Sequence, residues 1–227
     1  MTSSSTVVRK EKTRVLEVYS SVRRDILNGR LRPGEKLGPS VLSQQYGVSL
    51  SVVREALTRL AEQELVVSQP RQGFQVIPIS REDLLDLTSV RLDIETLALR
   101  RSVERGDVAW QSGLVAAHYL LEHTVQYEET DPPVMSEDWA TAHKAFHERL
   151  ISACGSARLL EIAKSLRDSA DLYRRWSSPI GGDSKRDIAG EHRAIFEAVQ
   201  AGDVELAVKE LHKHISHTTN VLLKHAT

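Results

Sequence analysis

The stretch from Val48 to Val67 places the tightest constraint on how this chain folds. Its apolar residues recur at the three- and four-residue spacing of a helix with one buried face. They are Val53, Ala56, Leu57 and Leu60. The opposite face begins with Ser49, Leu50 and Ser51 and continues to Arg54, as expected for a helix that enters a DNA major groove. A surface helix without a nucleic-acid partner fits the helix alone equally well.

Two helices are expected before this stretch and a hairpin after it. Residues 14–29 have helical periodicity that ends at Gly29, and a short helix covers about 41–47. Two strands follow, separated by a tight turn. The strands are 65–67 and 74–77, and the turn is 69–73. Three helices and a two-stranded hairpin predict a winged helix-turn-helix.

The rest of the chain predicts helices alone. Pro78-Ile79 marks a domain boundary, and the capping pattern of Ser80 to Asp83 follows it. Six helices are expected, at about 81–105, 107–128, 135–153, 156–177, 184–201 and 203–225. Short connections favour an antiparallel bundle. The fold class is therefore mainly α, with a flexible arm over 1–13, a winged helix-turn-helix domain over 14–78 and an antiparallel all-helical domain over 80–227.

Charge is distributed unevenly along the chain. Residues 1–78 hold 12 Lys and Arg against 7 Asp and Glu, which leaves 30 − 12 = 18 basic and 31 − 7 = 24 acidic residues beyond them. A basic N-terminal part fits contact with phosphate. The single cysteine, Cys154, excludes an internal disulfide and fits the cytoplasm. With no secretory signal and no apolar run near the roughly 18 residues of a membrane span, no membrane partner is expected.

Four histidines lie on expected helices beside apolar residues. His143 and His147 are four residues apart, so they project from one face of a helix, and His192 and His214 occupy two later helices. Four converging imidazoles suit Zn²⁺, Ni²⁺ or a similar ion. The same spacing also occurs among core and surface histidines that bind nothing, so spacing alone leaves both interpretations open.

The N-terminal segments LRPGEKL, VSLSVVREALTRL and RQGFQV together resemble the GntR-type DNA-binding domain. The resemblance implies a homodimer that binds palindromic operator DNA, with base contacts from the third helix and minor-groove contacts from the wing. Carried over by position, the DNA-binding residues are Ser49, Leu50, Ser51, Arg54, Arg71, Gln72 and Gly73. Leu50 departs from the family pattern, in which arginine is common. Since leucine cannot form bidentate bonds to guanine, Arg54 is expected to carry the polar contact, unless it pairs with Glu55 or Glu62.

The C-terminal part resembles the FCD effector domain in its short, six-helix form. The matching segments are VRLDIETLALR, HKAFHERLISACGSARLLEI and EHRAIFEAVQAGDVELAVKEL. By position the resemblance implies four metal ligands, His143, His147, His192 and His214. His143 stands where aspartate is usual, and Ser156 stands where asparagine often follows glycine. Losing that carboxylate favours an anionic ligand, and four nitrogen ligands favour zinc or nickel over harder ions.

Together these features predict a transcription regulator, specifically a repressor that a small carboxylate controls. By resemblance, Arg91 binds the carboxylate, although pairing with Glu95 one turn later is an equal alternative. One rival is an architectural DNA binder with a purely structural bundle. Another is a helical metallohydrolase, which needs a base beside the metal. Glu148 and Glu191 each neighbour a ligand in sequence, but adjacent helical residues point about 100° apart, so no enzyme activity is expected.

Overall fold

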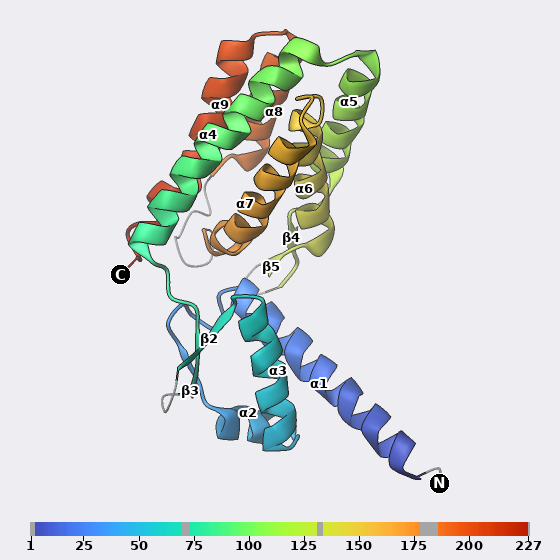
Figure 1. The fold of residues 1–227 in the computed structure, drawn as a ribbon, viewed down its shortest axis with the longest axis vertical. Helices are drawn as coiled ribbons and strands as arrows, with labels where there is room; N and C mark the ends of the chain where they lie inside the picture. The colour runs from blue at the N-terminus through green and yellow to red at the C-terminus, as the bar shows by residue number, and fades with distance from the viewer. Residues whose placement is uncertain (1–2, 70–72, 131–133, 178–185, 227) are drawn as a thin grey trace. The chain divides into compact units, whose positions relative to one another are not determined.

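A computed structural model describes residues 3–69, 73–130, 134–177 and 186–226 of the chain. Helices dominate these residues, which confirms the mainly α fold class (Figure 1). The chain divides into two compact units, one built on residues 1–80 and the other on residues 81–224. Each unit has its own hydrophobic core and is described by itself.

The N-terminal unit is the expected winged helix-turn-helix with one additional strand. Its elements are α1 (Ser3–Leu27), β1 (Lys36–Leu37), α2 (Pro39–Tyr46), α3 (Leu50–Glu62), β2 (Val66–Gln69) and β3 (Gly73–Val76). The strands form an antiparallel sheet in the order β1-β3-β2. The prediction of a two-stranded hairpin was therefore incomplete. Only two residues long, β1 shows no alternation that a sequence pattern could reveal.

The turn between α2 and α3 explains where the third helix begins. Gly47 has φ +60°, a left-handed conformation that ends α2. Ser49 then caps α3, because its side chain accepts a hydrogen bond from the backbone N–H of Val52. The buried stripe that includes Val53 and Leu57 faces α1. These local signals fix which residues of α3 point outward.

Helix α1 begins earlier than the sequence analysis expected. It starts at Ser3 rather than Arg14, so the segment expected as a flexible arm is helical from Ser3 onward. No glycine or proline interrupts residues 3–27, and the run RKEKTR contains good helix formers.

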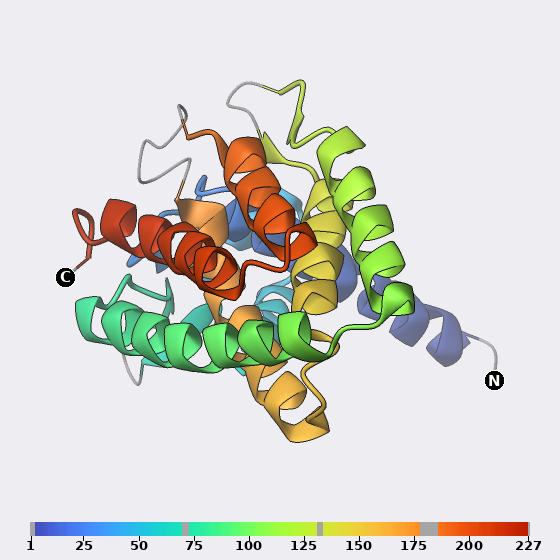
Figure 2. The ribbon, with the colours of Figure 1, turned by 90° about the horizontal axis from the view of Figure 1, so that it is seen from above.

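The second unit is a bundle of helices with one short ladder. Its helices are α4 (Arg81–Arg105), α5 (Val108–His123), α6 (Glu137–Ile151), α7 (Ala157–Trp176), α8 (Ile188–Gln200) and α9 (Val204–Leu222). Helix α4 packs along α9 and α7, α5 packs on α6, and α8 packs on α9 (Figure 2). Among the described helices, none combines the length and apolar character that crossing a bilayer requires.

The expectation of helix through residue 128, with no strand beyond the wing, was wrong. Helix α5 ends at His123 because Thr124 adopts an extended conformation, and β4 (Tyr127–Glu128) then pairs with β5 (Val134–Met135). The β-branched Thr124 and Val125 favour extended backbone at this point. The expected loops at 131–133 and 178–182 lie outside the described residues.

The core of the bundle is mostly apolar, with buried polar side chains gathered at one level and a few others elsewhere. Its largest fully buried side chains include Leu99, Leu114, Phe146, Leu150, Ile195 and Leu211. At that level lie Glu95, with no exposed surface, and four of the five buried histidines, namely His143, His147, His192 and His214. Buried polar groups require partners or ligands. This polar level is therefore where a functional site is to be sought.

Candidate functional site

Three helices deliver the four histidines to one place inside the bundle. His143 and His147 come from successive turns of α6, His192 from α8 and His214 from α9. Each is at most 8% exposed. Helical periodicity explains the convergence, because each histidine lies on the side of its helix that carries the buried apolar residues.

The spacing of the ring nitrogens fits a single bound ion. One nitrogen from each histidine can be chosen so that all four lie within 4.8 Å of one another. The Nε2 atoms of His147 and His192 are 3.3 Å apart. Tetrahedral zinc with bonds of about 2.0–2.1 Å places its ligand atoms roughly 3.3–3.4 Å apart. The donor set and this distance therefore fit a divalent transition metal.

Burial keeps these imidazoles neutral, which a ligand requires. It lowers the pKa of His143, His147 and His192 well below the ordinary value, and the neighbouring positive groups add to the effect. Burial also lowers the pKa of His214, although a hydrogen bond to Glu191 opposes that shift. Neutral rings leave a nitrogen lone pair on each histidine for an ion.

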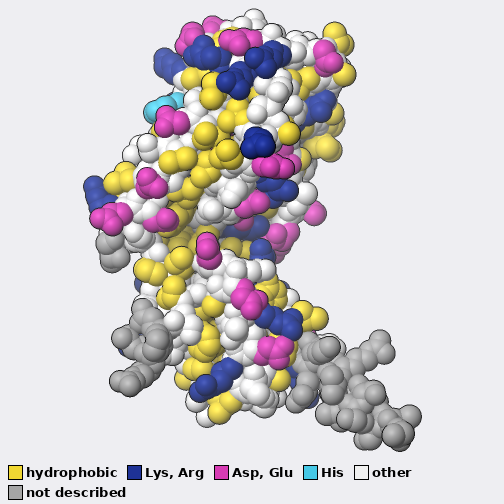
Figure 3. All heavy atoms as spheres, in the orientation of Figure 1, with side chains coloured by type: hydrophobic (Ala, Val, Ile, Leu, Met, Phe, Trp, Pro, Cys, Tyr) yellow, Lys and Arg dark blue, Asp and Glu magenta, His cyan; other side chains and the backbone are white. Residues whose placement is uncertain are grey.

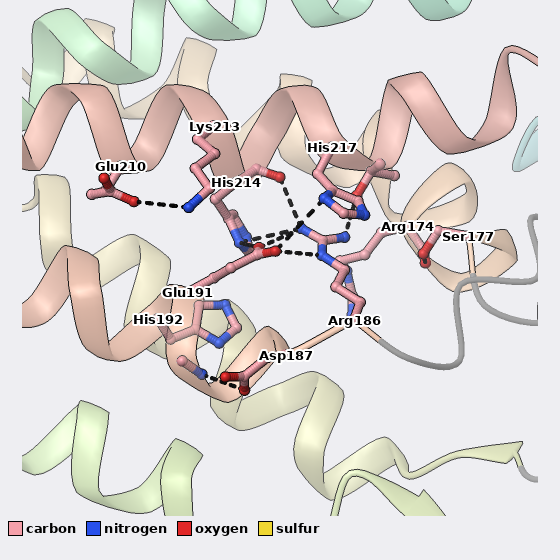
Figure 4. Close-up of polar contacts among 12 residues, drawn as sticks. Arg174, Ser177, Arg186, Asp187, Glu191, His192, Glu210, Lys213, His214 and His217 are labelled. Atoms are coloured by element: carbon pink, nitrogen blue, oxygen red, sulfur yellow. Dashed lines mark hydrogen bonds and ion pairs between the residues drawn. The ribbon is translucent and has the colours of Figure 1, made fainter.

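Glu191 orients His214 from outside the cluster (Figure 4). Its Oε2 lies 2.8 Å from Nδ1 of His214, so the ring donates its Nδ1 proton and leaves Nε2 free for an ion. Burial would raise the pKa of Glu191, but hydrogen bonds from His214 and Arg186 outweigh it and lower the pKa to about 2. The carboxylate is therefore ionised at neutral pH. Since it is held by these donors, it is not placed as a general base.

Arg186 forms hydrogen bonds both to the Glu191 carboxylate and to helix α9. Its Nε and Nη2 donate to the two oxygens of Glu191 at 2.9 and 2.6 Å. Its Nη2 also donates to the backbone carbonyl of His214 at 2.9 Å, and its Nη1 to Thr218 at 3.0 Å. The bidentate pair is mostly buried, with the Arg186 side chain 4% exposed and the Glu191 side chain 14% exposed. It fixes the position of Glu191 against His214.

Aromatic rings and a cavity border the histidines on another side. Trp139 stacks on His143 with centroids 4.9 Å apart, and the guanidinium of Arg174 lies 5.8 Å from the Trp139 ring. A cavity of about 130 Å³ reaches His192. Its lining is His118, Leu121, Glu122, Thr124, Gln126, Trp139, Ala189 and His192. A small polar molecule would thus have room beside the cluster.

Arg91 lies on α4 and is paired within its own helix. Its Nε donates to Oε1 of Glu95 at 2.8 Å. The ion pair with Glu95 that the sequence analysis gave as the alternative is therefore present. Arg91 is not among the residues that line the cavity beside His192. The ion pair with Glu95 uses only the Nε–H of Arg91. The role of Arg91 in binding an effector stays a prediction.

The residues expected to meet DNA gather at the exposed start of α3. Ser49, Leu50, Ser51 and Arg54 are all exposed, with Leu50 at 47%. Among the described residues, Arg54 makes no ion pair, because Glu55 bonds instead to Arg59 at 2.7 Å. The start of α3 therefore presents polar groups and the guanidinium of Arg54 to the solvent.

The expected wing tip is described only in part. Arg71 and Gln72 lie outside the described residues. Gly73 begins β3 with φ +88°, a left-handed conformation that suits the end of a tight turn. The contribution of the wing to DNA binding stays a prediction.

Several residues near the histidines had no place in the sequence prediction. From the sequence, no role is assigned to Arg186 or Arg167, and Glu191 is considered only as a base next to His192. Their roles arise from contacts between helices distant in sequence, such as Glu191 with His214. No spacing rule within one helix could have found them.

Comparison with known families supports two domains. Residues 14–76 match the family model for bacterial regulatory proteins of the gntR family, and residues 86–217 match the model for the FCD domain.

Relatives match over most of the chain. It is 34% identical over 204 residues to a protein of Paraburkholderia xenovorans (strain LB400) described as the uncharacterized HTH-type transcriptional regulator BphR, covering 90% of this chain and 83% of that protein. It is 29% identical over 203 residues to the HTH-type transcriptional repressor GlaR of Escherichia coli (strain K12), and the match covers 88% of this chain and 91% of that protein.

Solved structures share the fold. A putative GntR transcriptional regulator from Rhodococcus sp. RHA1 aligns with a TM-score of 0.61 at 24% identity, over 95% of this chain and all (100%) of that one. McbR/YncC of E. coli aligns with a TM-score of 0.59 at 22% identity, over 93% and 97%. At these identities the likeness concerns the fold alone.

Proposed function

The chain belongs to the gntR family of bacterial regulatory proteins and carries an FCD domain, and from that premise we propose a repressor that a metal-dependent effector site controls. It is a DNA-binding transcription regulator and not an enzyme. The repressor GlaR is among its relatives. Acting on bacterial DNA, it would work in the cytoplasm. The observation that carries the proposal is the convergence of four buried histidines from three helices.

The N-terminal unit binds operator DNA through the start of α3. Arg54 supplies the polar contact to a base or phosphate, and Leu50 contacts an apolar base edge such as the thymine methyl. Ser49 and Ser51 are small enough to let the helix approach the groove. Arg71, Gln72 and Gly73 reach the minor groove from the wing. The exposure of the start of α3 supports this arrangement, as does an Arg54 side chain that makes no ion pair among the described residues.

His143, His147, His192 and His214 hold one divalent transition metal, zinc or nickel. The nitrogen donor set favours these ions over harder ones such as Mg²⁺. When bound, the ion supplies an electrophilic point for a carboxylate oxygen. Glu191 keeps His214 in the tautomer that directs Nε2 inward, and Trp139 covers His143. Neutral histidines leave the charge of the ion uncompensated, which favours an anion.

The effector is a small carboxylate, with Arg91 as its second contact. Bound effector changes the relative stability of two arrangements of the regulator, and operator affinity falls. Arg91 has further N–H groups besides the one that Glu95 accepts, so it can bind a carboxylate without losing that pair.

The active form is a homodimer on a palindromic operator. Large hydrophobic side chains remain exposed along α4, at Leu85 (44%), Val90 (37%) and Leu97 (39%). Figure 3 shows hydrophobic side chains along this helix. A second copy that covered such side chains would be stabilised by their burial. Size-exclusion chromatography with light scattering should give twice the chain mass of 25.4 kDa.

Fluorescence anisotropy tests the control of DNA binding. An operator fragment is selected from random-sequence DNA with the metal-loaded protein, and small carboxylic acids are then titrated into the complex. The proposal predicts that at least one acid releases the DNA, and that chelator removes its effect. Tight DNA binding that no acid changes, with or without metal, would support the architectural alternative instead.

A further inference from the structure

Two guanidinium groups converge on one fully buried carboxylate. Arg91 from α4 and Arg167 from α7 donate through their Nε atoms to opposite oxygens of Glu95, each at 2.8 Å. The carboxylate has no exposed surface, and the two arginine side chains are 16% and 11% exposed. Burial would raise the pKa of Glu95, but the charges of the two arginines lower it. The trio therefore carries one excess positive charge.

One donor of this trio lacks an acceptor. Nη1 of Arg167 is buried and has no hydrogen-bond partner among the described residues. A buried donor on a charged group costs free energy unless an acceptor meets it. Arg167 is already held by Glu95 through Nε, so Nη1 is a fixed donor that a ligand oxygen could satisfy.

The trio lies close to the histidine cluster. Helix α4, which carries Arg91 and Glu95, packs against α6 and α9, the helices of His147 and His214. After burial and the other histidines, the charges of Arg167 and Arg91 also lower the pKa of His147.

The remaining arginines around the cluster have carboxylate partners. Arg174 and Arg175 both bond to Asp171, Arg175 also bonds to Glu137, and Arg186 bonds to Glu191. Together with Arg91, Arg167 and Glu95, five guanidinium groups thus face four carboxylates, which leaves one excess positive charge. A divalent ion held by four neutral imidazoles raises the excess to three positive charges. In a buried region such charges are stabilised by anions brought close to them. One carboxylate leaves two of them uncompensated, whereas a molecule with two carboxylates leaves one.

We infer that the effector is a dicarboxylic acid, with one carboxylate directed at the histidine-held ion and the other at Arg91 and Arg167. Glu95 is a positioning residue that holds the two guanidinium groups side by side. The inference rests on the proposed carboxylate effector and narrows its chemical class. It also assigns Arg167 as a ligand-binding residue from a helix that carries no histidine of the cluster.

Isothermal titration calorimetry on the full-length, zinc-loaded protein tests the inference with acids of equal chain length. The pairs are propionate with malonate, butyrate with succinate, and valerate with glutarate. At least one dicarboxylate should bind tenfold or more tightly than its monocarboxylate partner. Equal or tighter binding of the monocarboxylate in every pair would overturn the inference and leave the carboxylate effector intact. If none of the six acids binds the zinc-loaded protein, the inference and the carboxylate effector both fail.

Substitutions of Arg167 show whether this side chain carries the preference. Arg167→Gln should weaken the preferred dicarboxylate at least tenfold and leave its monocarboxylate partner within threefold. Arg167→Lys keeps the charge beside Glu95 and serves if the glutamine variant is unstable; it should retain part of the preference. Arg100→Gln is the matched control, because Arg100 also pairs with a glutamate, Glu205, but at the surface. A preference unchanged in both Arg167 variants would overturn the assignment.

Discussion

The two units of this regulator place their candidate functional residues in opposite environments. The start of α3 exposes Ser49, Leu50, Ser51 and Arg54 to solvent, whereas the bundle buries all four histidines. Exposed groups can bind a charged, hydrated partner such as DNA without any change in their own protonation. Buried groups act only when burial and neighbours set their protonation and geometry. Substitution of an exposed side chain that makes no contact within its own unit, such as Arg54, should therefore change affinity alone, whereas substitutions in the buried cluster should change affinity and stability together.

The largest expected effect is in the exposed unit. Arg54→Ala should weaken operator binding about 100-fold, because a bidentate contact contributes roughly 1–3 kcal/mol at each half-site of a dimer. Its melting temperature should not change, since Arg54 makes no ion pair with a described residue. Anisotropy and differential scanning fluorimetry measure the two effects.

Two substitutions on the same helix sharpen that result. Leu50→Ala should change base preference at one position per half-site. Arg59→Ala removes an arginine that pairs with Glu55 and should leave DNA affinity within threefold. Operator binding by Arg54→Ala at the wild-type level would mean that α3 does not lie in the groove as proposed.

In the buried unit, Glu191→Gln should weaken metal binding about 10–100-fold, the usual result of losing the group that orients a ligand histidine. The amide cannot reproduce the charged acceptor that His214 and Arg186 share. Competition with a fluorescent zinc chelator measures the affinity. Glu210→Gln is the control, because Glu210 contacts Lys213 and no ligand. Equal weakening in both variants would remove Glu191 from the metal site.

The bundle should also lose stability at mildly acidic pH when it holds no metal. The folded-state pKa values of the four histidines are lowered from 6.5, so only the unfolded chain takes up these protons as pH falls below that value. Each such imidazole contributes about 1.4 kcal/mol per pH unit. In chelator, the melting temperature should fall by several degrees between pH 7.5 and 5.5. The Glu191 contribution, with its pKa of about 2, is lost only at lower pH, from about 4.5 downward.

Single histidine variants show whether the loss of stability at acidic pH comes from the buried histidines or from other groups that take up protons. His147→Gln should flatten the pH dependence, whereas His212→Gln, at an exposed position of α9, should leave it unchanged. A melting temperature that does not vary over this range in chelator would contradict the buried neutral state of the cluster.

The smallest expected effect concerns the cap that sets the register of α3. Ser49→Ala removes the acceptor for the Val52 N–H and should cost about 1 kcal/mol, or roughly 2–4 °C in melting temperature. Ser51→Ala is the comparison, because the Ser51 hydroxyl lies 2.9 Å from that of Ser49 but accepts from no described backbone N–H at the start of the helix. Equal melting temperatures for both variants would show that the cap contributes little.

The sequence predicts features that depend on interactions between residues close together in the chain, and it misses those that depend on contacts between distant residues. The bounds of α4 and the convergence of the histidines depend on caps and helical periodicity, which lie within short segments. Strand β1 depends on pairing Leu37 with Phe74, and the β4–β5 ladder depends on a similar pairing across a loop. The contact of Glu191 with His214, and that of Arg167 with Glu95, join helices far apart in sequence. Such partners become visible only once the packing of the bundle is known.

Metal content tests the central claim most directly. Protein purified after exchange into zinc and then into metal-free buffer should hold one ion per chain by mass spectrometry of the metal. His147→Ala combined with His192→Ala should hold none, and chelator should lower the melting temperature of the wild type only. Much less than one ion per chain in the wild type, with a melting temperature that chelator does not change, would contradict the account.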